Sequence, residues 1–183
     1  MQDPIRRIIV PAAGAAGPRN AWLLTDGPLT LVDPGPDTAA AYGAVRDSLA
    51  RFGCSIRDIE RLVLTHAHDG HAGLTARIHA DSGARVLAHP GALEALRDPS
   101  AALERRVLNW SRAVKAAGVP PDRAARIVEG VRASLLEERA GASPAPPPAA
   151  APLADGERLD GRARARRRGR SGTSAATART TSR

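Results

Sequence analysis

Between residues 29 and 90 the sequence alternates short apolar runs with longer stretches whose apolar residues recur at helical spacing. The apolar runs have the length of buried strands, and each longer stretch ends at a glycine, as helices commonly do. Such alternation of strand and helix predicts an α/β fold in which helices are layered on a central sheet. The expected strands lie within 29–35, 61–66 and 84–90, and the expected helices lie at 38–53 and 72–83.

The flanking segments extend this pattern on both sides. A β-like run at 6–12 precedes the stretch 21–35, which is typical of two strands joined by a turn at Asp26–Pro28. From residue 92 to 140 the pattern becomes helical and contains two candidate helices. Pro121 suits the first turn of the second candidate helix, because its missing N–H is not needed there.

These patterns divide the chain into one domain and a tail. The domain is expected to span 1–158, with a helical insertion at 101–140 and a Pro/Ala-rich linker at 141–153. Trp22 and Trp110 stand in apolar patterns and are predicted to be core residues. The segment 159–183 is rich in arginine, lacks hydrophobic periodicity and is predicted to be a disordered tail. Read one nucleotide back, the codons of Gly172–Thr173 and of Ala176–Thr177 can each encode histidine, which suggests the hypothesis that the segment is translated from an alternate reading frame.

The basic charge of the chain is concentrated in this tail. The formal net charge is +8, and residues 161–183 contain eight arginines and no acidic residue. The remaining residues therefore sum to about zero. A tail of this kind contacts phosphate without base recognition and in a salt-sensitive way. We therefore predict no specific nucleic-acid partner.

Cysteine content and hydropathy suggest where the protein resides. Cys54 is the single cysteine, so the chain forms no internal disulfide, which is typical of a reducing compartment. No apolar run reaches the ~20 residues that a membrane-spanning helix needs, and the first residues do not resemble a signal peptide. The expectation is a cytoplasmic protein without membrane association.

Three of the five histidines are clustered within six residues, directly after an expected strand. They are His66, His68 and His71, in the stretch "LVLTHAHDGHAG". His66 and His68 project to the same side of an extended backbone, and His71 follows at the start of the next expected helix. Neutral imidazole is a preferred ligand of zinc, so the cluster predicts a metal site. His79 and His89 stand alone in the sequence and are expected to be structural.

The stretch "LTHAHDGHAG" resembles the signature of the metallo-β-lactamase fold family, which reads T-H-x-H-x-D-H. Thr65, His66, His68 and His71 match this signature in place. The upstream "NAWLL" and "LVDPG" are also similar to that family, in which an Asp-x-Gly follows a strand. The resemblance covers about residues 5 to 158 and is greatest to the glyoxalase-II-like hydrolases.

The resemblance implies an αββα sandwich, of which the N-terminal half matches this sequence, and a hydrolase with one or two zinc ions. His66 and His68 would bind the first metal, His71 would bind the second, and Asp33 would be a structural residue beside the site. The implied reaction is zinc-hydroxide attack on the ester or thioester bond of a small molecule.

The sequence departs from the family signature at one position of the motif. Gly70 stands where the family has its metal-binding aspartate, and Asp69 lies one residue early. Asp69 is a candidate metal ligand and catalytic residue, and the alternative interpretation is a plain Asp-Gly turn. No histidine follows His89, so later ligands of the family have no counterpart, and at most one weakly held zinc is expected. Two hypotheses therefore remain: an active hydrolase of reduced efficiency, and a non-catalytic truncated relic that still binds metal.

Overall fold

The computed structural model describes residues 3–12, 17–140 and 149–153 of the chain. The predicted Arg-rich tail at 159–183, and most of the predicted linker, lie outside the described residues. The strands are β1 (Ile5–Val10), β2 (Arg19–Leu24), β3 (Thr30–Val32), β4 (Arg61–Leu64), β5 (Arg85–Ala88) and β6 (Ala151–Pro152). The helices are α1 (Ala39–Arg51), α2 (Asp69–Ala72), α3 (Thr75–Ser82), α4 (Pro90–Arg97), α5 (Pro99–Ala116) and α6 (Pro121–Ala140), with a 3₁₀ turn at Ile56–Asp58.

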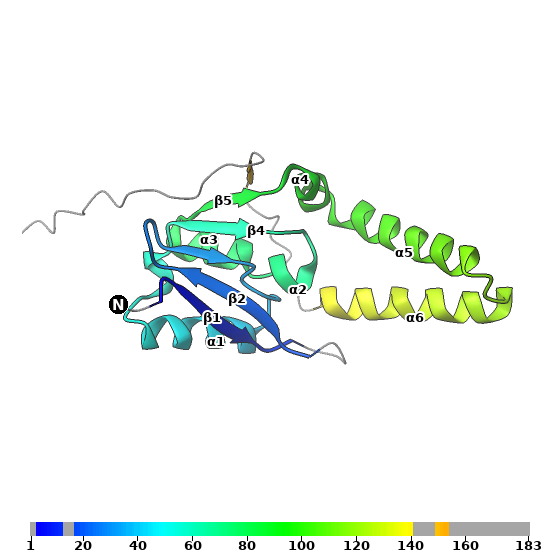
Figure 1. The fold of residues 1–183 in the computed structure, drawn as a ribbon, viewed down its shortest axis with the longest axis horizontal. Coiled ribbons are helices and arrows are strands. Elements are labelled where there is room, and N and C mark those ends of the chain that lie inside the picture. The colour runs from blue at the N-terminus through cyan, green and yellow to red at the C-terminus, as the bar shows by residue number, and fades with distance from the viewer. Residues whose placement is uncertain (1–2, 13–16, 141–148, 154–183) are drawn as a thin grey trace, which may run out of the picture.

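The strands form one six-stranded sheet in the order β1-β2-β3-β4-β5-β6 (Figure 1). β1, β2 and β3 pair antiparallel, whereas β3, β4, β5 and β6 pair parallel. The mixed sheet confirms the predicted α/β class. At the end of the linker expected at 141–153, Ala151–Pro152 pair with β5, and the Leu153 amide donates to the Ala88 carbonyl at 2.9 Å. Proline suits this outermost position of the sheet, where it need not donate to a further strand.

One face of the sheet is covered by helices and carries the main core. α1 begins at the predicted cap, where the hydroxyl of Thr38 accepts a hydrogen bond from the Ala41 amide at 3.1 Å. The stripe that Val45 and Leu49 form on α1 is fully buried, and α3 adds Ile78. Strand residues at alternate positions complete this core: Ile8, Val10, Ala21, Leu23, Leu31, Leu62, Leu64, Val86 and Ala88.

The opposite face of the sheet is more open at its antiparallel end. Side chains alternate between faces along a strand, so Ile9 points away from the core that contains Ile8. Ile9 is 56% exposed and Trp22, on the neighbouring strand, is 41% exposed. The prediction that Trp22 and Trp110 are core residues is wrong, because an apolar pattern does not show which face of an element is covered. The described residues supply one sheet of the expected αββα sandwich.

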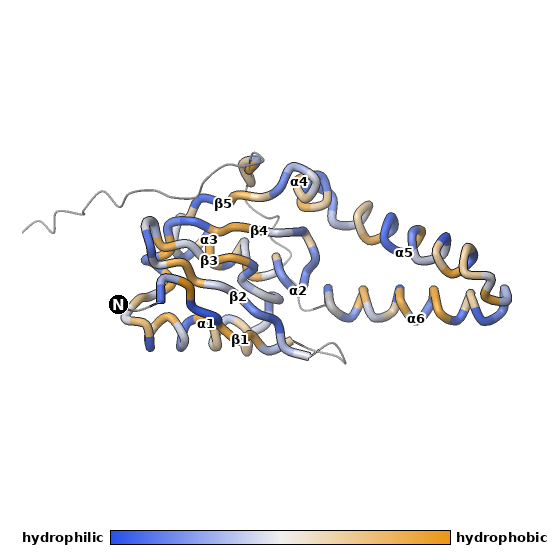
Figure 2. The backbone as a smooth tube through the Cα atoms, in the orientation of Figure 1, coloured by the Kyte–Doolittle hydropathy of each residue, from blue (hydrophilic) through white to orange (hydrophobic). Residues whose placement is uncertain are grey.

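α5 and α6 form an antiparallel hairpin that projects away from the sheet (Figure 1). Leu103 and Val107 of α5 pack against Leu135 of α6. Glu104 accepts two hydrogen bonds from the guanidinium of Arg132, at 2.8 and 3.0 Å, which ties the two helices together. The hairpin alternates between hydrophobic and hydrophilic residues along its length, while the central strands are mainly hydrophobic (Figure 2).

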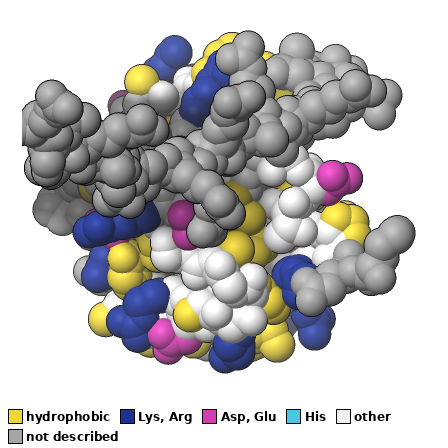
Figure 3. Space-filling model, turned by 90° about the vertical axis from the view of Figure 1, so that its left-hand side faces the viewer, with side chains coloured by type: hydrophobic (Ala, Val, Ile, Leu, Met, Phe, Trp, Pro, Cys, Tyr) yellow, Lys and Arg dark blue, Asp and Glu magenta, His cyan; other side chains and the backbone are white. Residues whose placement is uncertain are grey.

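Figure 3 shows the surface at the end of the molecule away from the hairpin. Basic side chains are scattered there among apolar and other groups, and no histidine is visible on the described surface of that end (Figure 3). None of the helices in the described ranges has the length and apolar character needed to cross a bilayer.

Candidate metal centre

The parallel strands bring the predicted site residues to one edge of the sheet. Asp33 directly follows β3, Thr65 and His66 directly follow β4, and His89 directly follows β5. The carboxyl ends of parallel strands meet at a single edge, which is where open α/β sheets bind ligands. Residues that lie more than thirty positions apart in the sequence therefore become neighbours.

Two backbone hydrogen bonds join the loop after β3 to α2 and to the residues that follow it. The amide of Gly35 donates to the carbonyl of His71 at 3.0 Å, and the amide of Leu74 donates to the carbonyl of Gly35 at 2.9 Å. Gly73 allows this close approach, because a Cβ atom at that position would lie 2.5 Å from the backbone nitrogen of Asp37. The loop and the helix are consequently fixed in register, and Asp33 is held beside His71.

Asp33 is the buried carboxylate of the site, with only 7% of its surface exposed. Its Oδ1 accepts a hydrogen bond from the backbone amide of Thr65 at 2.9 Å, and its Oδ2 accepts one from the Thr65 hydroxyl at 2.6 Å. Its Oδ2 also lies 3.3 Å from Nδ1 of His71. The backbone of Asp33 is left-handed, with φ of 50°, a conformation that aspartate and asparagine tolerate better than most residues.

These contacts fix the tautomer of His66. The Thr65 hydroxyl lies 2.8 Å from Nδ1 of His66. The single proton of that hydroxyl is donated to Asp33, so the imidazole must donate its Nδ1–H to the hydroxyl oxygen. The lone pair of His66 is then on Nε2 and is available to a metal ion. Histidine ligands in metal sites are commonly oriented by a hydrogen bond of this kind on the other ring nitrogen.

The electrostatic surroundings keep His66 neutral. Burial, which is the largest effect, and the neighbouring His71 and Arg106 lower the pKa of His66 below its usual value, although the charge of Asp33 opposes this. A neutral imidazole is the form that binds metal.

The structure brings Asp33, His66 and His71 into one group of potential metal ligands. One donor atom from each of them lies within 4.8 Å of the others. The Nδ1 atom of His71 is buried and has no hydrogen-bond partner, since its contact with Asp33 lacks hydrogen-bond geometry. Two imidazoles with a carboxylate are a donor set that suits zinc, and a buried nitrogen without a hydrogen bond is readily satisfied by a cation. The residues present therefore fit a divalent metal ion.

His68 and Asp69 lie next to this group and are not members of it. His68 precedes α2 and its ring stands edge-on to that of His66, with ring centres 4.5 Å apart. Asp69 is the first residue of α2, and Gly70 is buried. The role of Asp69 as metal ligand and catalytic residue stays a prediction.

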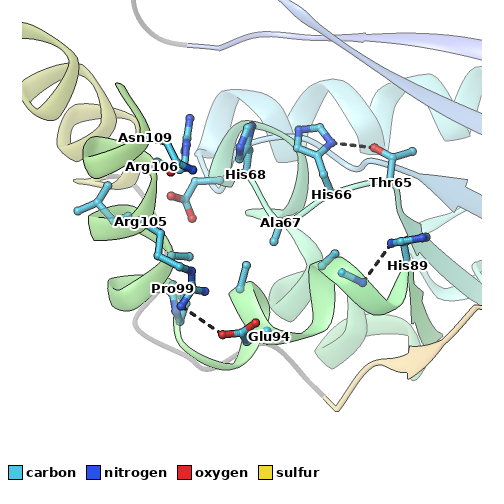
Figure 4. A pocket seen from close by; sticks show the side chains of 16 residues that line it. Thr65, His66, Ala67, His68, His89, Glu94, Pro99, Arg105, Arg106 and Asn109 are labelled. Carbon is cyan, nitrogen blue, oxygen red and sulfur yellow. Dashed lines mark hydrogen bonds and ion pairs between the residues drawn. The ribbon is translucent and has the colours of Figure 1, made fainter. Parts of the chain in front are cut away.

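A cavity of about 450 Å³ opens beside residues 65–69, here called the histidine loop (Figure 4). The histidine loop forms one wall of the cavity, and α4 and α5 form the other wall. The polar residues on the helical wall are Glu94, Arg105, Arg106 and Asn109. Arg105 forms an ion pair with Glu94 at 3.2 Å, which links the two helices at the rim.

The two remaining histidines have structural partners. Nδ1 of His79 lies 2.9 Å from the carbonyl of Ala84, to which it donates. Nδ1 of His89 accepts a hydrogen bond from the Gly91 amide at 3.1 Å and so caps α4. His89 also lines the cavity, a placement that its position in the sequence did not indicate.

Comparison with known proteins identifies the family of the chain. A family model described as the metallo-beta-lactamase superfamily matches residues 14–162. The chain belongs to the metallo-beta-lactamase superfamily. The probable metallo-hydrolase YqjP of Bacillus subtilis strain 168 is 43% identical over 72 residues, which cover 39% of this chain and 23% of that protein. The metallo-beta-lactamase family protein TTHA1429 of Thermus thermophilus has a similar structure, with a TM-score of 0.58 and 29% identity over 86% of this chain and 48% of that chain.

Membership of the metallo-beta-lactamase superfamily confirms the resemblance inferred from the motif, while the nearer resemblance to glyoxalase-II-like hydrolases stays a prediction. The chain spans less than half the length of either relative. Sequence reasoning did not single out Arg106 and Asn109 on the cavity wall. Their spacing of three on an expected helix was a usable signal, because residues three apart share a helix face.

Proposed function

We propose that this chain is a metal-dependent hydrolase that acts on the ester or thioester bond of a small molecule, with zinc as its metal. The observation that carries the proposal is the group formed by Asp33, His66 and His71 at the edge of the sheet, directly beside a cavity. The size of this cavity, about 450 Å³, suits a small molecule.

In this proposal His66 and His71 of this group hold the metal, and His68, which lies outside the group but has its ring 4.5 Å from that of His66, is a further ligand. Asp33 and Thr65 position them, because the hydrogen bonds from Thr65 to Asp33 fix the ring of His66 and the carboxylate of Asp33 faces His71. A divalent ion bound there lowers the pKa of water and polarises a carbonyl oxygen. The side chains of this chain contribute imidazole nitrogens, a fixed ring orientation at His66 and a cavity wall that excludes part of the solvent.

Asp69 is proposed as a further ligand and as the residue that accepts a proton at the cavity wall. Two substitutions distinguish this role from that of a turn residue. Asp69→Ala lowers metal content if Asp69 binds the metal, and Gly70→Asp raises it if the carboxylate is needed one residue later. If neither substitution alters metal content, neither position contacts the metal.

The test of the proposal is metal content together with hydrolysis. Purified full-length chain is loaded with Zn²⁺, dialysed and analysed by mass spectrometry, and its hydrolysis of p-nitrophenyl acetate and of an acetyl thioester is measured. We expect at most one zinc per chain, and its loss in His66→Ala and His71→Ala. His79→Ala is the matched control, because His79 bonds the Ala84 carbonyl outside the site.

The outcomes separate the two hypotheses. Zinc that depends on His66 and His71, together with zinc-dependent hydrolysis, supports the hydrolase. Histidine-dependent zinc without hydrolysis of either substrate supports the non-catalytic alternative. Zinc content that does not change in His66→Ala or His71→Ala would contradict the metal centre itself.

A further inference from the structure

The helix α5 carries two functional faces. Leu103 and Val107 pack toward α6 and form a small apolar core with it. Arg105, Arg106 and Asn109 line the cavity beside residues 65–69, which Leu103 also borders. Because Arg106 and Asn109 lie three residues apart, their side chains share one helix face. The hairpin therefore supplies polar groups to a site whose candidate metal ligands follow β3 and β4 or lie in α2.

The two arginines of this face differ in their partners. Arg105 is ion-paired with Glu94 of α4 at 3.2 Å, so its charge is compensated at the rim. Arg106 forms neither an ion pair nor a hydrogen bond within the described residues. Besides the histidines, Glu94 and Arg105, the charged residues on the cavity wall are Asp69 and Arg106.

The position of Arg106 relative to the histidines follows from two observations. In Figure 4, Arg106 and Asn109 lie on α5 at the level of His68, whereas Arg105 lies further down the same wall and extends toward Glu94. The positive charge of Arg106 is also among the groups that act electrostatically on His66. The guanidinium therefore lies at the same end of the cavity as the metal-binding rings.

α5 is held firmly enough to present these groups. The bidentate pair between Glu104 and Arg132 fixes α5 on α6, and the Arg105–Glu94 pair fixes it on α4. Asp98 caps the start of α5, since its Oδ1 accepts a hydrogen bond from the Ala101 amide at 2.9 Å. A guanidinium on a fixed helix loses less entropy when it binds an anion than one on a free loop does.

We propose that Arg106 and Asn109 form a subsite for a carboxylate group of the substrate, so that the preferred esters or thioesters are those of dicarboxylic acids. This inference rests on the proposed hydrolase function. The guanidinium presents a fork of N–H donors that matches a carboxylate, and the amide of Asn109 adds a further donor. One positive charge matches a carboxylate monoanion better than a phosphate dianion. The carboxylate binds at the α5 wall, and the scissile carbonyl is placed at the histidine loop.

The experiment compares two esters that differ only in this charge. p-Nitrophenyl hydrogen adipate and p-nitrophenyl hexanoate have the same acyl chain length, and only the first ends in a carboxylate. The ratio of their kcat/KM values is measured on the zinc-loaded full chain after subtraction of the uncatalysed rate. The variants are Arg106→Gln, Arg106→Lys and, as matched control, Arg112→Gln, which removes the same charge from α5 outside the cavity.

We expect the wild type to prefer the adipate ester and Arg106→Gln to lower the ratio about tenfold, the value of one charge-assisted hydrogen bond. Arg106→Lys should retain part of the preference, and Arg112→Gln should retain all of it. A ratio near one in the wild type, or an unchanged ratio in Arg106→Gln, would overturn the subsite while leaving the hydrolase proposal intact.

A binding measurement keeps the subsite testable if neither ester is hydrolysed. Adipate is titrated into chelator-treated full chain by calorimetry. Binding that weakens about tenfold in Arg106→Gln and not in Arg112→Gln supports the subsite. In that case the carboxylate subsite stands, and only the proposed hydrolysis is refuted. Equal binding by wild type and Arg106→Gln, or no binding by either, overturns the subsite.

Discussion

Asp33 offers the sharpest test of how the site is built, because this residue combines a left-handed backbone with a carboxylate that accepts two hydrogen bonds. Its left-handed φ of 50° places the carboxylate under the end of β4. There it accepts hydrogen bonds from the amide and the hydroxyl of Thr65, at 2.9 and 2.6 Å. Three substitutions separate the backbone contribution from the hydrogen bonds: Asp33→Asn, Asp33→Gly and Asp33→Ala.

The expected magnitudes follow from these contacts. Hydrogen bonds to a charged group contribute about 1.5–3 kcal/mol each, and the lower value applies to this partly buried pair. Asp33→Gly loses both bonds and keeps an unstrained backbone, so its unfolding free energy should fall by about 3 kcal/mol. Asp33→Ala additionally places a Cβ in the left-handed region and should lose roughly a further 1 kcal/mol. Asp33→Asn keeps an acceptor for the Thr65 amide and tolerates the backbone, so it should lose only about 1 kcal/mol.

The assay is urea unfolding of the chelator-treated chain, followed by circular dichroism and analysed by linear extrapolation. Metal is removed so that the measured differences report the protein contacts alone. The order of stability should be wild type, Asn, Gly, Ala. An alanine variant within about 0.5 kcal/mol of wild type, the range of ordinary surface substitutions, would refute the network. A glycine variant no more stable than the alanine variant would refute the strain argument.

Three further predictions test neighbouring features. Gly73→Ala should destabilise the chain in thermal unfolding and lower its metal content, since the new Cβ would lie 2.5 Å from a backbone nitrogen. The control Gly130→Ala has open space in α6 and should be neutral or stabilising by up to about 1 kcal/mol. In the metal-free chain, NMR titration should give His66 a pKa below about 6.5, and a higher midpoint would contradict the burial argument. Because the folded state disfavours protonation of His66, the stability that this group contributes is present at pH 7 and is lost as the pH falls. Ile8→Ala should cost about 2–5 kcal/mol in urea unfolding and Ile9→Ala under about 1 kcal/mol, and equal costs would disprove the assignment of the two faces of β1.

The parts of the fold that the sequence predicted are those with local signals. α1 has a capping threonine at one end and Gly53, with φ of 76°, beyond the other, and it lies where these residues predicted. The hairpin of β2 and β3 and the parallel strands β4 and β5 were likewise expected from short apolar runs. Pro121 does begin α6. Each of these signals depends only on residues within a few positions of one another.

The parts that were missed depend on contacts between distant segments. The helix expected at 72–83 is divided into α2 and α3, because α2 begins within the motif at Asp69 and the chain turns at Gly73 against the loop after β3. α4 was not separated from the helical region that follows it. Trp22 is exposed because no described helix covers that part of its face, and no local pattern records which face is covered.

The site shows the same division between local and distant information. The motif letters identify His66 and His71, but three imidazoles within six residues would repel one another if they were protonated, and a proton would compete with the metal. At His66, burial under the rest of the fold lowers the pKa and favours the neutral form, and the Thr65 hydroxyl, which donates to Asp33, orients the ring. Asp33 lies 32 positions before Thr65, and it reaches the motif only because β3 and β4 are parallel neighbours. The sequence motif therefore supplies His66 and His71 of the candidate metal group, and the pairing of these two strands adds Asp33 to it.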